Sequence, residues 1–285
     1  MRNKLTNFMN RLIARLRPIP HWNPIIVYQM GKVGSASIQQ SLLATFKTMG
    51  VEVPVHHIHN LDNLEAMEKA ILQSHVRHNP EVTLMGIRLG LELKKQMDEN
   101  PDKQWDLISL VRDPVARNIS DFFYGLQEII PNCERLYETG RLSIEDMQEA
   151  FLTKFNHHIT PKVWFDTQMK TVFKIDVYAR PFPKHKGFEI YKDAKNVRLL
   201  LIRLEDLNRV AEQAMTGFLQ IKRFNLIQSN VGAEKQYASL YRDFKKLPLP
   251  KAYLEEIYGT KFAKHFYTDH EIENFYEKWA SMGKK

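Results

Sequence analysis

The sequence predicts an α/β fold in which helices flank a central parallel sheet of about five strands. Short apolar runs rich in β-branched residues recur along the chain, as expected for strands buried on both faces. Longer segments with helical spacing separate these runs, and a strand–helix–strand order implies right-handed parallel crossovers. The five predicted strands are residues 25–28, 51–58, 82–87, 107–111 and 197–203.

Residues 21–285 are expected to form a single domain, because they contain no internal repeat, low-complexity tract or Gly/Ser linker. Residues 1–20 stand apart from this domain. Within residues 1–17, apolar residues recur at helical spacing, the remaining face is basic, and no acidic residue is present. Such an amphipathic helix lies either on an anionic membrane surface or against the domain, and both options stay open.

Composition limits the partners without choosing among them. The net charge of +8 favours anionic ligands such as nucleotides, charged sugars, nucleic acid or acidic lipid. The one cysteine, Cys133, excludes an internal disulfide and suits a reducing cytoplasm. There is neither an apolar run long enough to span a membrane nor a secretory signal. The predicted location is therefore the cytoplasm, with peripheral contact at the inner membrane face if residues 1–17 bind lipid.

The first predicted strand leads into a glycine-containing turn and then a helix, with Ser35 or Ser37 expected as the N-cap. The first amides of a helix lack intrahelical partners and carry the positive end of its dipole, so this turn is a candidate anion site. Lys32 adds a positive charge. The candidate binding residues are Gly31, Lys32, Val33, Gly34, Ser35, Ala36 and Ser37.

This turn differs from a Walker A loop, which requires G-x-x-x-x-G-K-[ST]. Ile26 stands five residues before Gly31, and Val33 follows the lysine. An ordinary strand-to-helix turn with a surface lysine therefore stays open as an alternative.

Histidines and arginines follow the later predicted strands. His57 and His59 crowd the end of the strand at 51–58, and Arg88 follows the strand at 82–87. Ligands bind at such carboxyl ends in open α/β sheets. Arg112 follows the strand at 107–111, on the same predicted edge as Lys32.

The segment after Arg112 predicts a helix with Asp113 as its cap and Pro114 in its first turn. Ser120 lies on that helix, eight residues after Arg112. Further along, residues 126–160 are expected to form covering helices, residues 172–186 a loop, and residues 253–279 a helical tail rich in aromatic residues.

The stretches KVGSAS and RDPVARNIS resemble the signature of sulfotransferases that use 3′-phosphoadenosine 5′-phosphosulfate (PAPS). The resemblance implies a P-loop-like three-layer sandwich. It also implies that Lys32 and the following turn hold the 5′-phosphosulfate, while Arg112 and Ser120 hold the 3′-phosphate. Two departures are Gly31, where many members have proline, and Ala36, where a hydroxyl is common.

Later stretches resemble bacterial capsular polysaccharide synthesis proteins, a branch of the same superfamily. The resemblance covers most of residues 24–279. The glycine-rich 3′-phosphate segment of the cytosolic animal enzymes is absent, and Lys235 is a candidate substitute. The stretches are WFD at 164–166, GFEIYKDAKNVRLLLIRLEDL at 187–207, the pattern of Asn230, Lys235 and Tyr237, and HFYTDHEI with a later Trp at 265–279.

The expected reaction is transfer of a sulfuryl group from PAPS to a hydroxyl of a glycan or glycolipid, with positioning and electrostatics as the main catalytic effects. Lys32 would neutralise the leaving phosphate. His59, and after it His57, are candidate general bases because histidine titrates near neutrality. Arg88 is a candidate for binding an anionic acceptor or the sulfuryl group. No metal is expected, since no ligand cluster has convincing spacing.

Two alternatives belong to other classes. A P-loop-type nucleotide kinase would need a serine or threonine after the lysine and a strand-end aspartate for Mg²⁺. A non-catalytic nucleotide- or nucleic-acid-binding module is suggested by the charge of +8. Nucleic acid is not an expected partner, because basic and aromatic residues do not interleave along one strand.

Overall fold

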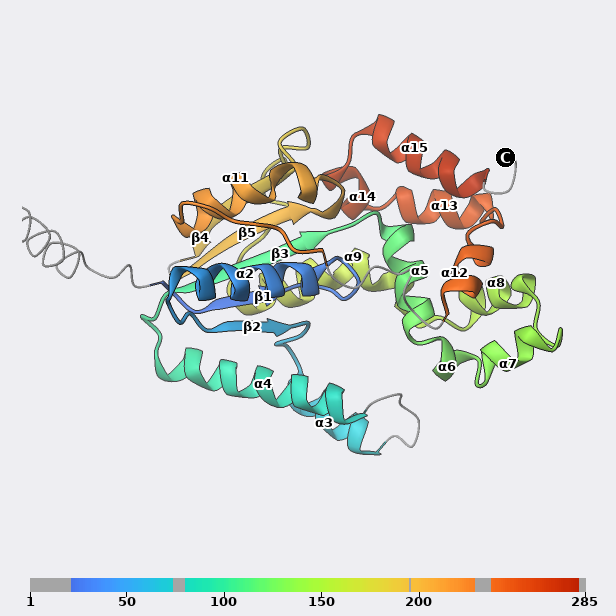
Figure 1. Ribbon diagram of the computed structural model, residues 1–285, viewed down its shortest axis with the longest axis horizontal. Coiled ribbons are helices and arrows are strands. Elements are labelled where there is room, and N and C mark those ends of the chain that lie inside the picture. Colours follow the sequence, from blue (N-terminus) through green and yellow to red (C-terminus); the bar gives the residue numbers. More distant parts are fainter. Residues whose placement is uncertain (1–21, 74–79, 195, 229–236, 282–285) are drawn as a thin grey trace, which may run out of the picture.

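The computed structural model describes residues 22–73, 80–194, 196–228 and 237–281 (Figure 1). Five strands form one sheet in the order β2-β1-β3-β5-β4. Neighbouring strands are parallel except β4, which runs antiparallel to β5 at one edge. The strands are β1 (Ile25–Tyr28), β2 (Val55–Ile58), β3 (Trp105–Val111), β4 (Phe188–Ala194) and β5 (Val197–Arg203).

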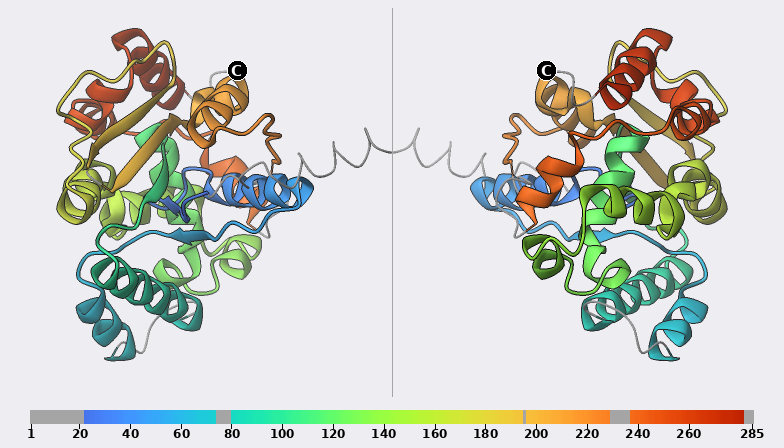
Figure 2. Two further views of the ribbon diagram at one scale, coloured as in Figure 1. Left: turned by 90° about the vertical axis from the view of Figure 1, so that its left-hand side faces the viewer. Right: turned by 90° about the vertical axis from the view of Figure 1, so that its right-hand side faces the viewer.

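The helices surround this sheet and extend beyond its carboxyl edge (Figures 1 and 2). They are α2 (Ser35–Met49), α3 (Leu64–Gln73), α4 (Pro80–Glu99), α5 (Pro114–Tyr124), α6 (Leu126–Ile129), α7 (Cys133–Glu138), α8 (Ile144–Thr153), the 3-10 helix η1 (Asn156–Ile159), α9 (Thr160–Trp164), the π-helix η2 (Phe165–Lys170), α10 (Thr171–Phe173), the 3-10 helix η3 (Leu204–Asp206), α11 (Leu207–Leu219), α12 (Ala238–Phe244), α13 (Lys251–Tyr258), α14 (Lys261–Phe266) and α15 (Asp269–Ala280).

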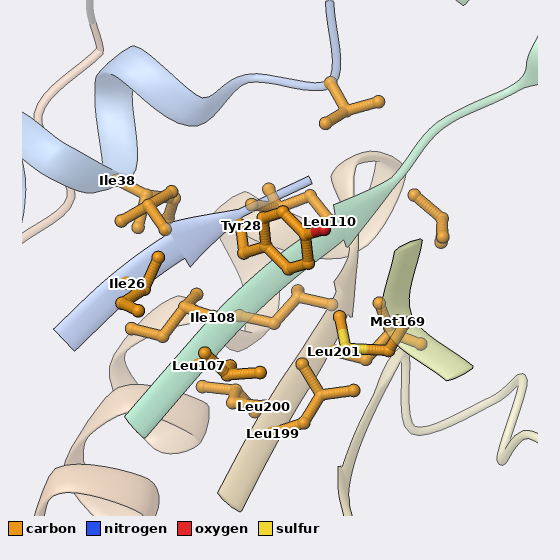
Figure 3. Close-up of a cluster of buried hydrophobic side chains, with 14 of the residues drawn as sticks. Ile26, Tyr28, Ile38, Leu107, Ile108, Leu110, Met169, Leu199, Leu200 and Leu201 are labelled. Atoms are coloured by element: carbon orange, nitrogen blue, oxygen red, sulfur yellow. The ribbon is translucent and has the colours of Figure 1, made fainter. Parts of the chain in front are cut away.

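The strands β1 and β3 are buried along their whole length, which explains their mostly apolar sequences. Val27 pairs in register with Ile108, and Ile108 with Leu200 of β5. Figure 3 shows the side chains that fill the core around these central strands, among them Tyr28 and Met169. The fold class predicted from the apolar runs is confirmed as a mostly parallel five-stranded sheet flanked by helices.

Helices lie on both sides of the sheet (Figure 2). On one side Trp22 links α2 to α11, because it packs against Phe46 of α2 and donates a hydrogen bond to the Leu219 carbonyl of α11. On the other side Tyr28 packs against Trp164, the last residue of α9, and against Phe173, the last residue of α10.

A second apolar cluster lies beyond the carboxyl ends of the strands. Phe122 of α5 contacts Phe151 of α8 and Phe244 of α12 at its centre. The C-terminal helices α13 and α15 join the same cluster through Leu254 and Trp279. The extra C-terminal helices predicted from the sequence are thus present and cover α5.

Asp113 attaches these C-terminal helices to the end of β3. Its carboxylate accepts hydrogen bonds from the Val115 amide at 3.0 Å, Tyr258 Oη at 2.9 Å and Trp279 Nε1 at 2.9 Å. The predicted cap at the start of α5 is therefore confirmed, with Pro114 in the first turn. The Asp113 amide donates to Glu205 Oε1 at 2.7 Å, which also ties the end of β3 to the residues after β5.

One strand prediction is wrong, and another is too long. Residues 82–87 belong to α4, where Val82 and Met85 are exposed and Ile87 is buried on the helix face that covers the protein. The run is apolar all round, so its periodicity did not distinguish a strand from a helix. The fifth strand is instead β4, an edge strand whose charged residues hide the apolar pattern. The predicted strand at 51–58 begins only at Val55.

None of the helices within the described ranges is both long enough and apolar enough to cross a membrane. The predicted amphipathic helix of residues 1–17 lies outside the described residues, as do Asn230 and Lys235.

Candidate functional site

The turn after β1 takes its shape from two residues with left-handed backbone. Lys32 has φ 71° and Gly34 has φ 95°. Left-handed backbone is uncommon outside glycine, asparagine and aspartate, so Lys32 occupies a strained conformation of the kind that is found at functional sites. Gly34 is the N-cap of α2, which corrects the predicted Ser35 or Ser37. A glycine N-cap offers no side-chain acceptor to the first amides of α2, so these amides suit an anion.

The other predicted loop residues lie around this turn. Val33 and Ser35 are buried at the start of α2, and Ala36 and Ser37 are half-buried. Gly31 does not have a positive φ, so the first left-handed residue of the turn is Lys32 and not the glycine before it.

Replacing Gly34 with alanine is expected to lower the free energy of unfolding by about 1–3 kcal/mol, because a Cβ there meets a positive φ and a close neighbour. An ideal Cβ would lie 2.7 Å from Leu204 Cδ1. Gly31→Ala is the matched control, since its Cβ meets no atom within 4 Å. Urea denaturation of both variants measures the difference, and equal stability of the two would contradict this account of the turn.

Arg112 reaches the turn from the end of β3. Its Nη1 donates a hydrogen bond to the Lys32 carbonyl at 3.0 Å. The two predicted phosphate-binding segments therefore lie side by side at the carboxyl edge of the sheet. Ser120 lies two turns along α5 and is half-buried.

The Lys32 ammonium lies over the ring of Tyr124, with 3.0 Å between Nζ and the ring centroid. Tyr124 is the last residue of α5, and its ring is exposed. This cation–π contact holds the ammonium at the surface of the site, between the turn and α5.

Three polar side chains, Arg117, Asp121 and His157, form a hydrogen-bonded group that joins the turn to α5 and η1. Arg117 Nε donates to the Gly31 carbonyl at 3.2 Å, and Nη1 donates to the His157 carbonyl at 3.1 Å. Asp121 accepts hydrogen bonds from Arg117 Nη2 and from His157 Nδ1, both at 2.9 Å. Sequence reasoning missed this group. The i, i+4 spacing of Arg117 and Asp121 was an available signal, whereas nothing linked His157 to them.

His59 lies at the end of β2, beside the turn. Its Nδ1 donates to the Gln29 carbonyl at 2.8 Å, so in the neutral ring Nε2 carries the lone pair. Although the residue reaches solvent, burial of the ring lowers the pKa of His59; the hydrogen bond to Gln29 opposes this shift, and the Lys32 charge adds to it. The ring is therefore neutral near pH 7.

His57 is less accessible than His59. Burial, with a smaller contribution from His59, lowers the pKa of His57 to about 4. Its Nε2 is buried without a hydrogen-bond partner in the described structure, and its ring packs edge-on against His59. The geometry thus favours His59 over His57 as a group that meets substrate.

The predicted strand-end position of Arg88 is wrong, because residues 82–87 belong to a helix. Arg88 lies on α4, its side chain is 69% exposed, and Nε is 3.5 Å from Glu68 Oε1. It is not at a strand end and does not join the turn.

Two lysines missed by sequence reasoning gather near Arg112. Lys278 immediately precedes Trp279, whose indole donates to Asp113 at the end of β3. Burial lowers the pKa of Lys245, and the charges of Lys278 and Arg112 lower it further. Because Lys245 senses the charges of both other residues, we call Arg112, Lys245 and Lys278 the cationic cluster.

Two aromatic residues from the stretches that carry the resemblance, Trp164 and Tyr237, pack with the apolar clusters. Trp164 is buried and donates its Nε1 hydrogen to the His59 carbonyl at 3.0 Å. Tyr237 packs against Phe123. Within the described ranges, no group of three or more His, Cys, Asp or Glu side chains is arranged to hold a metal ion.

A pocket of about 590 Å³ lies elsewhere, at the amino ends of β3 and β5. Its lining includes Trp105, Lys103 and Val197 and none of the residues of the turn. Ligands in parallel α/β sheets bind at the opposite, carboxyl edge, so the turn remains the candidate site.

Residues 141–268 match the model of a family described as "Putative capsular polysaccharide synthesis protein". The matched segment contains His157 and Lys245, but neither Lys32 nor Arg112. No curated protein and no solved structure matches the chain. The predicted resemblance to capsular polysaccharide synthesis proteins is confirmed over this segment.

Proposed function

We propose that the protein is a sulfotransferase that moves a sulfuryl group from PAPS to a hydroxyl of a glycan or glycolipid. The hydrogen bond from Arg112 to the Lys32 carbonyl carries the proposal, because it joins two anion-binding segments at one sheet edge. A nucleotide with phosphates at both its 3′ and 5′ positions matches such a pair. The family match supports a role in polysaccharide synthesis.

Lys32 and the amides at the start of α2 would hold the 5′-phosphosulfate. An acceptor oxygen forms a bond to sulfur while the bond from sulfur to the bridging oxygen breaks. The bisphosphate departs with the electron pair, and negative charge grows on its 5′-phosphate. Fixed donors aimed at this charge stabilise the transition state more than the ground state.

Arg112 would hold the 3′-phosphate, because a planar guanidinium donates two parallel hydrogen bonds to phosphate oxygens. Ser120 adds a hydroxyl donor from α5. Lys245 and Lys278 would add charge where the glycine-rich segment of the animal enzymes is absent, a role for which Lys235 is the candidate from the sequence. No metal enters this scheme.

Arg112→Ala is expected to weaken binding of 3′-phosphoadenosine 5′-phosphate by about 10- to 100-fold, as loss of a charge-assisted hydrogen-bonding group implies. Adenosine 5′-monophosphate should bind both proteins equally, because it lacks the 3′-phosphate. Equal losses for both nucleotides would mean that Arg112 only shapes the turn. Arg88→Ala, on the exposed face of α4, is the matched control.

The proposal is tested by incubating the protein with ³⁵S-labelled PAPS and a panel of glycans and lipid-linked sugars. Label in an acceptor, lost in the Lys32→Asn variant, is the expected result. Phosphate transfer from ATP with Mg²⁺ would instead show that the protein is a kinase and would overturn the proposal.

We expect a cytoplasmic protein that is held at the membrane by residues 1–17. Binding to vesicles of anionic lipid, measured for the full chain and for a variant that lacks these residues, tests this expectation.

A further inference from the structure

The Asp121 carboxylate lies within the candidate site and is nearly enclosed by protein. Its side chain is 13% exposed. Burial alone would raise the pKa of Asp121, but the hydrogen bond from His157 and the charge of Arg117 outweigh it and hold the pKa below its ordinary value. Asp121 is therefore ionised at neutral pH, and it is a fixed negative charge among the cations of the site.

Arg117 fixes the position of His157 relative to the turn. Its side chain is 4% exposed, and one guanidinium binds both the Gly31 carbonyl and the His157 carbonyl. The start of η1 is thereby held against the turn that carries Lys32. The Lys32 charge also favours the ionised form of Asp121 and adds to the lowering of its pKa.

The hydrogen bond to Asp121 also sets the tautomer of His157. Because the carboxylate accepts, Nδ1 must carry the hydrogen, and in the neutral ring Nε2 carries a lone pair. The His157 side chain is 64% exposed, so an acceptor can approach this ring. A histidine whose Nδ1 is held by a carboxylate is oriented to take a proton at Nε2.

His59 presents the same tautomer in a less favourable setting for the protonated form. A general base becomes an imidazolium when it takes a proton. At His59 burial and the Lys32 and Arg117 charges act against that cation, while the hydrogen bond to Gln29 and the Asp121 charge favour it. At His157 the new charge would form 2.9 Å from the Asp121 carboxylate. The Nδ1 hydrogen is therefore held by a carboxylate at His157 and by a neutral backbone carbonyl at His59.

We propose that His157 is the general base of this site and that Asp121 orients it. The assignment rests on the proposed function. As the acceptor oxygen bonds to sulfur, its proton passes to His157 Nε2, while the electron pair of the broken sulfur–oxygen bond leaves with 3′-phosphoadenosine 5′-phosphate. The Nδ1 hydrogen stays on His157 throughout, shared with Asp121.

The test compares wild-type protein with His157→Asn and His59→Asn. Asparagine at 157 can still donate a hydrogen to Asp121, so the hydrogen-bonded group is kept while the base is lost. His270→Ala is the control, because that histidine is exposed on α15 and hydrogen-bonds Asn274 of the same helix. Calorimetry measures binding of 3′-phosphoadenosine 5′-phosphate, and release of this product from PAPS, to water or to a glycan acceptor, measures turnover.

We expect His157→Asn to lower turnover by about 100-fold or more, the usual effect of losing a general base, with unchanged affinity for the bisphosphate. His59→Asn should lose less. Unchanged turnover by His157→Asn would overturn the assignment, and so would a wild-type protein that binds the bisphosphate but never turns over PAPS. A wild-type protein that fails to bind the bisphosphate would instead contradict the proposed function.

Discussion

Lys32→Asn is expected to lower the rate of sulfuryl transfer by about 100- to 1000-fold, the range found when one donor to a developing negative charge is removed. Lys32 lies in the turn that follows β1 and has φ 71°. Its ammonium is placed by the ring of Tyr124, and its carbonyl is held by Arg112. The backbone and both neighbours thus fix one positive charge where the leaving phosphate would lie.

Asparagine is the informative substitution because it tolerates left-handed backbone better than alanine does. Lost activity would then reflect the missing charge and not a distorted turn. Lys32→Arg is the partner variant, since it keeps the charge and should retain more activity. Single-turnover rates with PAPS measure both, and a Lys32→Asn protein as fast as wild type would rule out the role given to Lys32.

Asp113→Ala is expected to lower the free energy of unfolding by about 3–5 kcal/mol, because it leaves several buried donors without an acceptor. The carboxylate accepts from Val115, Tyr258 and Trp279, and the residue is 2% exposed. The three donors come from α5, α13 and α15, so the substitution weakens the attachment of the C-terminal helices as a whole.

Thermal and urea denaturation measure this effect, with Asp269→Ala as the control. Asp269 also lies in the first turn of a helix, α15, but it is exposed and its loss should change stability little. Tyr258→Phe and Trp279→Phe each remove one donor and should cost less than Asp113→Ala. Unfolding transitions that coincide for Asp113→Ala and wild type would show that this network does not hold the helices.

The sequence predicted the parallel sheet because β1, β3 and β5 are apolar along most of their length, as strands covered on both faces must be. It also predicted that Lys32 and Arg112 share an edge, since both follow parallel strands. It misplaced Arg88 because the run before it is apolar on every side. Such a run fits a buried strand and a helix equally well.

The rest of the site comes from tertiary contacts that no local pattern encodes. His157 reaches the turn only because a buried arginine on α5 binds the carbonyls of both segments. The helix α15, which carries Lys278, is held at the end of β3 because Trp279 donates to Asp113, across a separation of 166 residues. Spacing along the chain carries no information about either approach, so these residues required the structure.

The most direct test of the central claim is a calorimetric titration of the wild-type protein with 3′-phosphoadenosine 5′-phosphate and, separately, with ATP and Mg²⁺. Arg112 and Lys32 lie together at one sheet edge, so the bisphosphate should bind more tightly than ATP. Binding that needs Mg²⁺ and favours ATP, or no binding of the bisphosphate, would contradict the assignment of this edge as a PAPS site.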